Sequence, residues 1–558
     1  MPKSLKKIFK WLLISFVSFI AIVVVGLFIF VNVLSIKAPA VDTTNISNQR
    51  IKLGDNFYKI SNNWIRKNEF GLWEMYAEGD PFERGLAIGK LSKELVQNQE
   101  EVFITEIKKW IPSETYLSIL KYFVIFFNRN LESYIPKEYL EEIYGVSLSG
   151  NPKYNFIGTP YERILNYHGA HDIGHSLQNM HLVGCTSFGL WGSRTADSSM
   201  LIGRNFDFYF GDDFAKDKIV CFINPSNGHK FMMVTWGGMM GAVSGMNDMG
   251  LTVTINSDKS DLTMSGKTPV SLVARTILQY AKNIKEAFEI VKNAKMFVSE
   301  SFLIGSAEDK KAVVIEKTDA ITAIYSGNPD DIICTNHFQS DELIAEKLNV
   351  ENILEETSTY RYARTKELLN TVKSADYLEM ASVLRNPYGM NNSDIGLGNE
   401  KAVNQLIAHH AVIFKPEQRL VWVSTAPYQL GAFVCYDLNK VFNEYPGLSI
   451  NDEIDERAML IPADTLLNTK KYQDYVQFKK QKTLIENRIK SDSKSISDET
   501  IKNFITTNPE FYLTYKIAGD YYKNTGNIES AKKYYNMSLT KELPSISEKK
   551  SIIKLLSK

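Results

Sequence analysis

One cysteine stands in a setting that suits nucleophilic chemistry. Cys185 follows Gly184 and precedes Thr186 and Ser187, whereas the other three cysteines have mostly apolar neighbours, as buried strand cysteines do. A glycine before a nucleophile permits tight backbone geometry, and neighbouring hydroxyls supply hydrogen bonds during acyl transfer. The setting therefore indicates a nucleophile, and a structural strand cysteine is the alternative.

A basic and an acidic residue follow Cys185 after a short polar turn. The segment Ser199–Asp207 reads SMLIGRNFD and contains Arg204 and Asp207. In a hairpin, both side chains would return close to Cys185. A guanidinium near a thiol favours the thiolate, which is the reactive form, and a carboxylate orients an amine or holds the arginine.

A histidine cluster offers a rival chemistry. His168, His171 and His175 lie at helical spacing with Asp172 between them. Such residues on one helix face could hold zinc and support a metal-dependent hydrolase. Two glycines weaken that helix, and the segment lacks the glutamate base of HExxH, so pocket-lining or structural histidines are the default interpretation.

The N-terminus predicts a membrane anchor. Residues 1–10 form a basic tail, residues 11–34 carry no charge, and residues 35–69 read as a linker. A helix over 11–34 would be about 36 Å long, enough for a hydrocarbon layer of about 30 Å. Lysines before the segment favour an N-terminus inside, so we expect a single-pass protein of the cytoplasmic membrane with its body outside.

The sequence pattern of the body changes twice along the chain. Residues 70–184 show helical periodicity, residues 185–465 show short β-type runs with hairpin signals and a few helices, and residues 466–558 are helical again. Strands joined by hairpins with helices between them predict layered sheets covered by helices. Within the last region, Tyr515–Pro544 resembles one tetratricopeptide repeat, which is either an ordinary α-hairpin or a surface for a protein partner.

Composition excludes some classes of function. The chain of 558 residues has 64 basic and 64 acidic residues, so it lacks the basic excess typical of nucleic-acid-binding proteins. Four cysteines without a CxxC pair exclude a disulfide scaffold and a tetrahedral cysteine cluster.

Several motifs in order resemble a known family. They are GDPFERGLAIG, GCTS, GRNFD, GMNDMGLTVTIN, CTNHF and TYRYAR, spread over roughly residues 70–440. This series resembles the cysteine-type N-terminal-nucleophile (Ntn) hydrolases, and most closely the isopenicillin N acyltransferase, or peptidase C45, group.

The resemblance implies a fold and a mode of maturation. The expected fold is α+β, a four-layer αββα sandwich, here with an N-terminal transmembrane helix and a C-terminal tetratricopeptide-like extension. The Gly184–Cys185 bond would be cut by the protein itself, leaving residues 1–184, with the helical region 70–184, as an α chain and residues 185–558 as a β chain. The cut would give Cys185 a free α-amine that acts as its base without a cofactor. The implied substrate is a small N-acyl amide or an acyl-CoA-type thioester.

The resemblance also assigns roles to residues. Arg204 and Asp207 would lie beside the nucleophile and its amine, Asn256 near the oxyanion hole, and Asn336 would donate to the oxyanion. Arg361 would support the site. Strand-end turn residues are the alternative interpretation of the two asparagines.

A function of another class stays open at this point. The chain could be a noncatalytic surface protein, an inactive sandwich whose C-terminal helices dock a partner. Presence of the whole residue set favours the enzyme.

Overall fold

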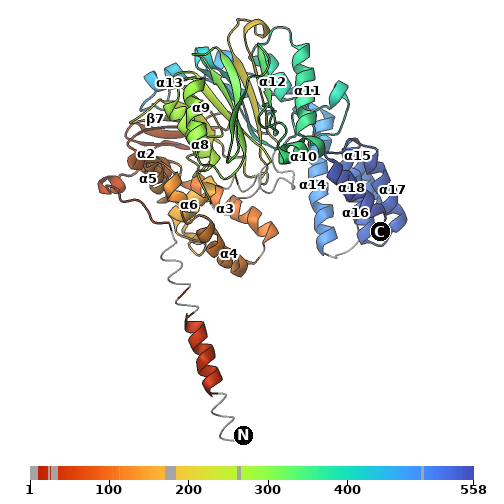
Figure 1. The fold of residues 1–558 in the computed structure, drawn as a ribbon. Coiled ribbons are helices and arrows are strands. Elements are labelled where there is room, and N and C mark those ends of the chain that lie inside the picture. Colours follow the sequence, from red (N-terminus) through yellow and green to blue (C-terminus); the bar gives the residue numbers. More distant parts are fainter. Residues whose placement is uncertain are drawn as a thin grey trace.

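The architecture comes from a computed structural model that describes residues 10–22, 26, 36–111, 113–169, 172, 184–259, 266–491 and 496–557. In this part of the chain, two sheets pack face to face between layers of helices (Figure 1). This arrangement agrees with the αββα part of the expected fold.

The larger sheet has eleven strands, all antiparallel to their neighbours except at one junction. Its order is β1 (Ile51–Gly54), β2 (Phe57–Ile60), β3 (Asn63–Lys67), β4 (Trp73–Gly79), β7 (Ile219–Pro225), β8 (Phe231–Thr235), β9 (Ser244–Asn247), β10 (Leu251–Ser257), β11 (Glu300–Ser306), β12 (Lys311–Lys317) and β13 (Thr322–Tyr325).

The smaller sheet has six strands and carries the candidate nucleophile at one end. Its order is β14 (Asp331–Cys334), β5 (Thr186–Leu190), β6 (Leu201–Asp207), β15 (Ala408–Lys415), β16 (Leu420–Ser424) and β17 (Phe433–Asp437).

Side-chain alternation explains why both faces of each sheet are covered. In β7, Val220 and Phe222 point into the core between the sheets, where they join Val412 of β15. Their neighbours Ile219 and Cys221 point the other way, into a second core formed with helices. Strands that are apolar on both faces must be buried on both, so the sequence pattern requires a helical layer outside each sheet.

Helices cover the two outer faces. The larger sheet is covered by α2 (Pro81–Leu91), α3 (Lys93–Trp110), α5 (Lys137–Ser147), α6 (Pro160–His168), α8 (Val270–Tyr280) and α9 (Ile284–Asn293). The smaller sheet is covered by α11 (Ser358–Thr371) and α12 (Tyr377–Leu384), on the opposite side from α8 and α9 in Figure 1. The remaining helices of these regions are α4 (Glu114–Phe127), α10 (Lys347–Glu355) and α13 (Leu438–Glu444).

The C-terminal region is helical, as predicted. It comprises α14 (Lys470–Ser491), α15 (Asp498–Thr507), α16 (Tyr512–Asn524), α17 (Ile528–Leu539) and α18 (Ile546–Leu556). A Cβ on Gly519 of α16 would lie 2.5 Å from the ring of Tyr535 on α17, so this glycine lets the two helices meet closely. The tetratricopeptide-like character of the pair, and a protein partner for it, stay predictions.

Residues 51–67, expected within a linker, form three strands of the larger sheet. Turns at Asp55–Asn56 and Ser61–Asn62 separate short alternating segments, which is a hairpin signal. Next in the sheet, β4 runs parallel to β7, pairing Trp73 with Ile219. Chain segments before and after Cys185 therefore share one sheet.

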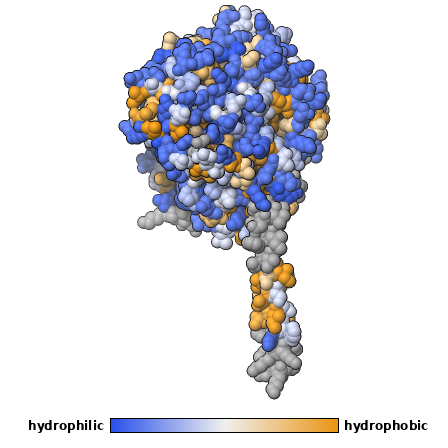
Figure 2. All heavy atoms as spheres, turned by 90° about the vertical axis from the view of Figure 1, so that its left-hand side faces the viewer, coloured by the Kyte–Doolittle hydropathy of each residue, from blue (hydrophilic) through white to orange (hydrophobic). Residues whose placement is uncertain are grey.

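The expected transmembrane helix over residues 11–34 is wrong. Residues 10–22 are helical and expose apolar side chains such as Trp11 and Ile22 (Figure 2), while 1–9, 23–25 and 27–35 lie outside the described residues. Nowhere in the described ranges is a helix long and apolar enough to span a membrane. The predicted single-pass topology, with the N-terminus inside, is therefore not supported.

A buried ion triad also joins the segments on either side of Cys185. Glu142 of α5 accepts hydrogen bonds from Arg84 of α2 at 3.0 Å and from Arg275 of α8 at 2.6 Å, and all three side chains are almost fully buried. Helices α2 and α5 approach closely at two glycines: a Cβ on Gly85 would lie 2.0 Å from the Glu142 carbonyl oxygen, and one on Gly145 would also clash.

Replacing Glu142 by alanine is expected to destabilise the protein by about 3–5 kcal/mol, because two buried guanidinium groups lose their counter-ion. Denaturant unfolding measures the effect. Lys137→Ala on the same helix is the control: its pair with Glu141 is solvent-exposed at the lysine end, so we expect a loss below about 1 kcal/mol. Equal unfolding midpoints for the Glu142 variant and the wild type would contradict the role of the triad.

Candidate active site

Cys185 lies directly before β5 and is fully buried. Ser187 of β5 pairs with Arg204 of β6, and the Gly184 N–H donates to the Asp207 carbonyl at 2.9 Å. The β5–β6 pairing therefore continues past Cys185. The hairpin returns Arg204 and Asp207 to the cysteine, as the spacing predicted.

Arg204 contacts the sulfur of Cys185. Its Nη2 donates to Cys185 Sγ at 3.5 Å, while Nη1 donates to the Val243 carbonyl at 3.1 Å and to Ser244 Oγ at 2.5 Å. Burial raises the pKa of the Cys185 thiol above its usual value, although Arg204 and Arg361 act in the opposite direction. In the uncut chain the thiol is therefore held in place but protonated, which differs from the thiolate expected beside an arginine.

Asp207 is a buried carboxyl without a hydrogen-bond partner among the described residues at either side-chain oxygen. Burial raises its pKa to about 7, against the opposing effect of Arg361 and Arg204. Its charge also acts on Cys185, where it raises the thiol pKa. A carboxyl with this pKa can exchange a proton near neutral pH.

Arg361 of α11 holds both Cys185 and Asn336. Its Nη1 donates to the Cys185 carbonyl at 2.5 Å and to Thr186 Oγ1 at 3.0 Å, and its Nη2 donates to Asn336 Oδ1 at 2.7 Å. This contact fixes the amide orientation of Asn336, so that Nδ2 is its donor; one N–H of Nδ2 reaches the Ser257 carbonyl at 2.8 Å. The oxyanion role expected for Asn336 stays a prediction.

Asn256 connects three strands. Its Oδ1 accepts from Ser187 Oγ of β5 at 2.8 Å, and its Nδ2 donates to the Cys334 carbonyl of β14 at 3.1 Å. The side chain lies at the same end of the sandwich as Cys185, and both of its polar atoms are engaged by neighbouring strands. Its expected place near an oxyanion hole stays a prediction.

Gln405 is a site residue that sequence reasoning missed. Its side chain is buried, and Nε2 donates to the carbonyl oxygen of Gly184 at 2.7 Å. A Cβ on Gly184 would lie 2.5 Å from that nitrogen, so only glycine fits here without a shift. The residue stands 221 positions away along the chain, and nothing in its own surroundings signals the contact.

Sequence reasoning also missed a second contact, which involves the serine that binds Arg204. Ser244 Oγ, which accepts from Arg204, lies 2.9 Å from Nε2 of His410, and His410 Nδ1 lies 2.8 Å from His409 Nδ1. Burial lowers the pKa of both histidines well below the usual value. The pair is therefore neutral and adds no positive charge beside Arg204.

Of the histidine cluster, the structure describes His168 and Asp172, and both contact backbone groups. Burial lowers the pKa of His168 to about 4. Its Nδ1 lies 2.8 Å from the Ile164 carbonyl, and its Nε2 accepts from the Met240 N–H at 2.9 Å. Both ring nitrogens are thus occupied by backbone groups. Asp172 Oδ2 accepts from the Val270 N–H at 3.0 Å, while His171 and His175 lie outside the described residues.

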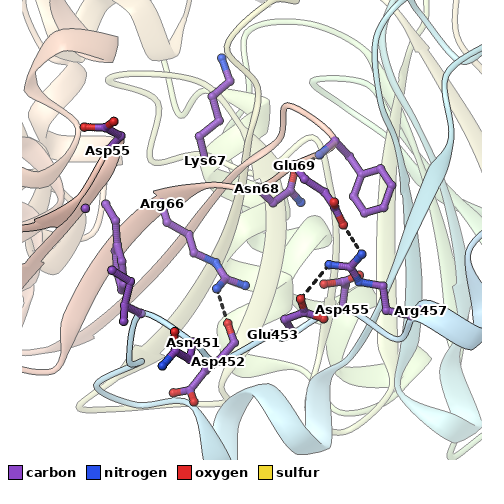
Figure 3. A pocket seen from close by; sticks show the side chains of 14 residues that line it. Asp55, Arg66, Lys67, Asn68, Glu69, Asn451, Asp452, Glu453, Asp455 and Arg457 are labelled. Carbon is purple, nitrogen blue, oxygen red and sulfur yellow. Dashed lines mark hydrogen bonds and ion pairs between the residues drawn. The ribbon is translucent and has the colours of Figure 1, made fainter.

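A charged pocket of about 490 Å³ lies away from Cys185, between β3 and the segment 450–457. Figure 3 shows that its charges face one another: Arg66 donates to the Asp452 carbonyl, and Arg457 pairs with Glu69 and Glu453. These charged groups therefore satisfy one another.

Comparison with known proteins bears on the family. Residues 193–426 match the sequence model of the acyl-coenzyme A:6-aminopenicillanic acid acyl-transferase family. The match includes Arg204, Asp207, Asn256, Asn336 and Arg361 and begins after Cys185.

Curated relatives align over part of the chain. A protein of Archaeoglobus fulgidus described as uncharacterized is 26% identical over 266 residues, covering 44% of this chain and 43% of the relative. Protein dcd1B of Dictyostelium discoideum is 22% identical over 277 residues, covering 46% and 52%. The chain thus spans about half the length of these relatives.

One solved structure similar to this chain is an N-acylethanolamine-hydrolyzing acid amidase ortholog of Caenorhabditis elegans. It is 18% identical with a TM-score of 0.31, and the alignment covers 42% of this chain and 93% of that one. A variant of conjugated bile acid hydrolase from Clostridium perfringens is 15% identical with a TM-score of 0.35, covering 48% and 95%. The resemblance inferred from the motifs is confirmed for residues 193–426, which match the acyl-coenzyme A:6-aminopenicillanic acid acyl-transferase family.

Proposed function

We propose that this protein is a cysteine Ntn amidohydrolase or acyltransferase that first cuts its own Gly184–Cys185 bond. It then acts on a small N-acyl amide or an acyl thioester through an acyl-enzyme on Cys185.

The observation that carries the proposal is the way in which this one peptide is held. Gln405 donates to the carbonyl of Gly184 at 2.7 Å, Arg361 donates to the carbonyl of Cys185 at 2.5 Å, and Arg204 contacts Sγ at 3.5 Å. A strand end has no structural need for three buried side-chain donors around one glycine–cysteine pair. Such donors instead suit a reaction that places negative charge on the Gly184 oxygen.

The self-cleavage proceeds through a thioester. The thiol of Cys185 gives its proton to a base and Sγ attacks the Gly184 carbonyl carbon, so that an S–C bond forms and an oxyanion develops opposite Gln405. The C–N bond to Cys185 then breaks, and its nitrogen takes up a proton to become an amine. Water hydrolyses the thioester, releasing the Gly184 carboxylate and restoring the thiol.

The cut chain has the groups for acyl transfer. An α-amine titrates near pH 7.7–8.0, so the amine of Cys185 serves as base for its own thiol. Sγ attacks the substrate carbonyl, the amine or thiol leaving group departs with a proton, and the acyl group passes to water or to an amine. Hydrolysis and transfer share this acyl-enzyme.

The two fragments would stay together after the cut. Strand β4 lies before Cys185 and pairs along its length with β7, which lies after it. The ion pair between Glu142 and Arg275 crosses the same boundary. Maturation therefore changes the covalent chain without dispersing its core.

N-terminal sequencing and intact mass of purified active protein test the proposal. We expect a fragment that begins with Cys185 and that gains the mass of an acyl group when it is quenched during turnover of an N-acyl amide. Active protein without such a fragment would overturn the self-processing step, and an acyl adduct on another residue would overturn the assigned nucleophile.

Self-cleavage is also expected to depend on the ionisation of Asp207. In the uncut chain burial raises the pKa of this carboxyl to about 7, so its carboxylate, the form that can accept the thiol proton, is populated only above that pH. The cleavage rate should rise through about pH 7 and then level off. Asp207→Asn should be slow and lack this inflection, as measured by fragment appearance between pH 5 and 9. The same inflection in the variant would contradict the assignment.

A further inference from the structure

A cavity of about 670 Å³ lies between the sandwich and the C-terminal helices. Tyr209, Gln405 and Tyr428 contribute to it from the sandwich, and Tyr475, Val476 and Phe478 contribute from α14. The volume falls within the range of small-molecule sites, about 300–1,000 Å³. Helix α14 follows the region that matches the family model, so this wall belongs to the chain's own extension.

The cavity reaches the scissile peptide through one side chain. Gln405 lines it, and the Nε2 of the same residue donates to the Gly184 carbonyl at 2.7 Å. Residues 406 and 407 then lead into β15, whose Ala408 pairs with Asp207, and Tyr209 follows Asp207 by two residues. The cavity therefore opens at the end of the smaller sheet where Cys185 lies.

The lining favours an apolar group. Aromatic rings and Val476 form much of the surface. Of the three lysines in the lining, Lys479 is already paired, since its Nζ lies 2.8 Å from Asp212 Oδ2 and donates to Tyr428 Oη at 2.6 Å. Lys482 pairs with Glu486 at 3.1 Å, and Lys480 is exposed to solvent. A charged ligand group would have to compete with these ion pairs. An alkyl or aryl group gains contact with the rings at no such cost.

We propose that this cavity binds the apolar acyl group of the substrate, with its carbonyl directed towards Cys185. The proposal rests on the proposed function for the identity of the reacting bond. In this proposal the C-terminal helices form one wall of the substrate site. They select substrates by the length of the acyl group.

Binding to an uncut, inactive chain tests the cavity independently of catalysis. The full chain with Cys185→Ala is titrated with N-dodecanoyl-7-amino-4-methylcoumarin and with its N-acetyl analogue, and binding is followed by fluorescence. We expect saturable binding of the dodecanoyl probe and at least about tenfold weaker binding of the acetyl probe, a factor equivalent to about 1.4 kcal/mol.

Two substitutions on α14 locate the binding. Val476→Trp, made in the Cys185→Ala chain, places an indole in the cavity and should weaken dodecanoyl binding at least tenfold; Val476→Phe should have a smaller effect in the same direction. Gln477→Trp is the matched control, because Gln477 is the next residue and is exposed, so its variant should bind as the parent does. Thermal unfolding of each variant confirms that it is folded.

Several outcomes would overturn the inference. They are a lack of saturable dodecanoyl binding, equal binding of the acetyl probe, or unchanged binding by both folded Val476 variants. Binding with the expected pattern in a protein whose wild type never cuts itself would support the cavity and refute self-processing, so the two proposals fail separately.

Discussion

Replacing Cys185 by alanine is expected to leave the 558-residue chain whole and to abolish acyl transfer. In the proposed mechanism, the substitution removes the sulfur that attacks the Gly184 carbonyl and that later carries the acyl group, and no water-mediated route replaces a covalent nucleophile at a fully buried position. Denaturing electrophoresis and intact mass should show one species for the variant, whereas the wild type should give fragments that end at Gly184 and begin at Cys185.

Cys221→Ala is the control for the loss of a buried thiol. Cys221 lies in β7, is also fully buried, and points into the apolar core shared with helices. Burial raises the pKa of its thiol far above the usual range, so it is inert, and its alanine variant should cut itself and turn over as the wild type does. Cleavage of the Cys185→Ala chain directly after Gly184 would refute the nucleophile.

Replacing Gln405 by leucine is expected to slow self-cleavage at least about 100-fold, the typical loss when one oxyanion donor is removed. The variant keeps the volume beside Gly184 but cannot donate to its carbonyl oxygen. Gln405→Glu, which has nearly the same shape, should be at least as slow, because an ionised carboxylate repels the developing oxyanion. The measurement is the rate of fragment appearance from freshly purified precursor.

Gln429→Leu separates this effect from the loss of any buried amide. Gln429 is fully buried and its Nε2 donates only weakly, at 3.4 Å, to the Leu384 carbonyl, far along the chain from Gly184. Its leucine variant should cut itself at the wild-type rate. If Gln405→Leu and Gln429→Leu are slowed equally, Gln405 acts through packing and the proposed donor role fails.

Much of the candidate site could be predicted from local sequence. Gly184, Cys185, Arg204 and Asp207 belong to one hairpin, and the geometry of antiparallel pairing returns the second strand to the start of the first. The short β-type runs joined by hairpin signals likewise predicted layered sheets covered by helices. Arg361 was identified only by resemblance, and the structure places its guanidinium on Cys185 and Asn336.

For other features, the sequence offered either no signal or a misleading one. Whether a buried histidine such as His168 faces a metal or a backbone amide depends on which groups surround it, and here both nitrogens meet backbone groups. The thiol pKa depends on burial as well as on its arginine neighbour, and burial is the larger effect. An apolar run of the right length predicted a membrane anchor, and no described helix has the length and apolar character to be one.

By itself, the sequence determined the strands, the candidate nucleophile and its hairpin partners, because these depend on local strand and turn patterns and on contacts within one hairpin. Only the tertiary structure decided that Gln405 would meet the Gly184 carbonyl, 221 positions away along the chain, and that α14 would wall a cavity beside it. Those contacts join distant segments, and their geometry is set by how the two sheets and the helical layers pack, which no local pattern encodes.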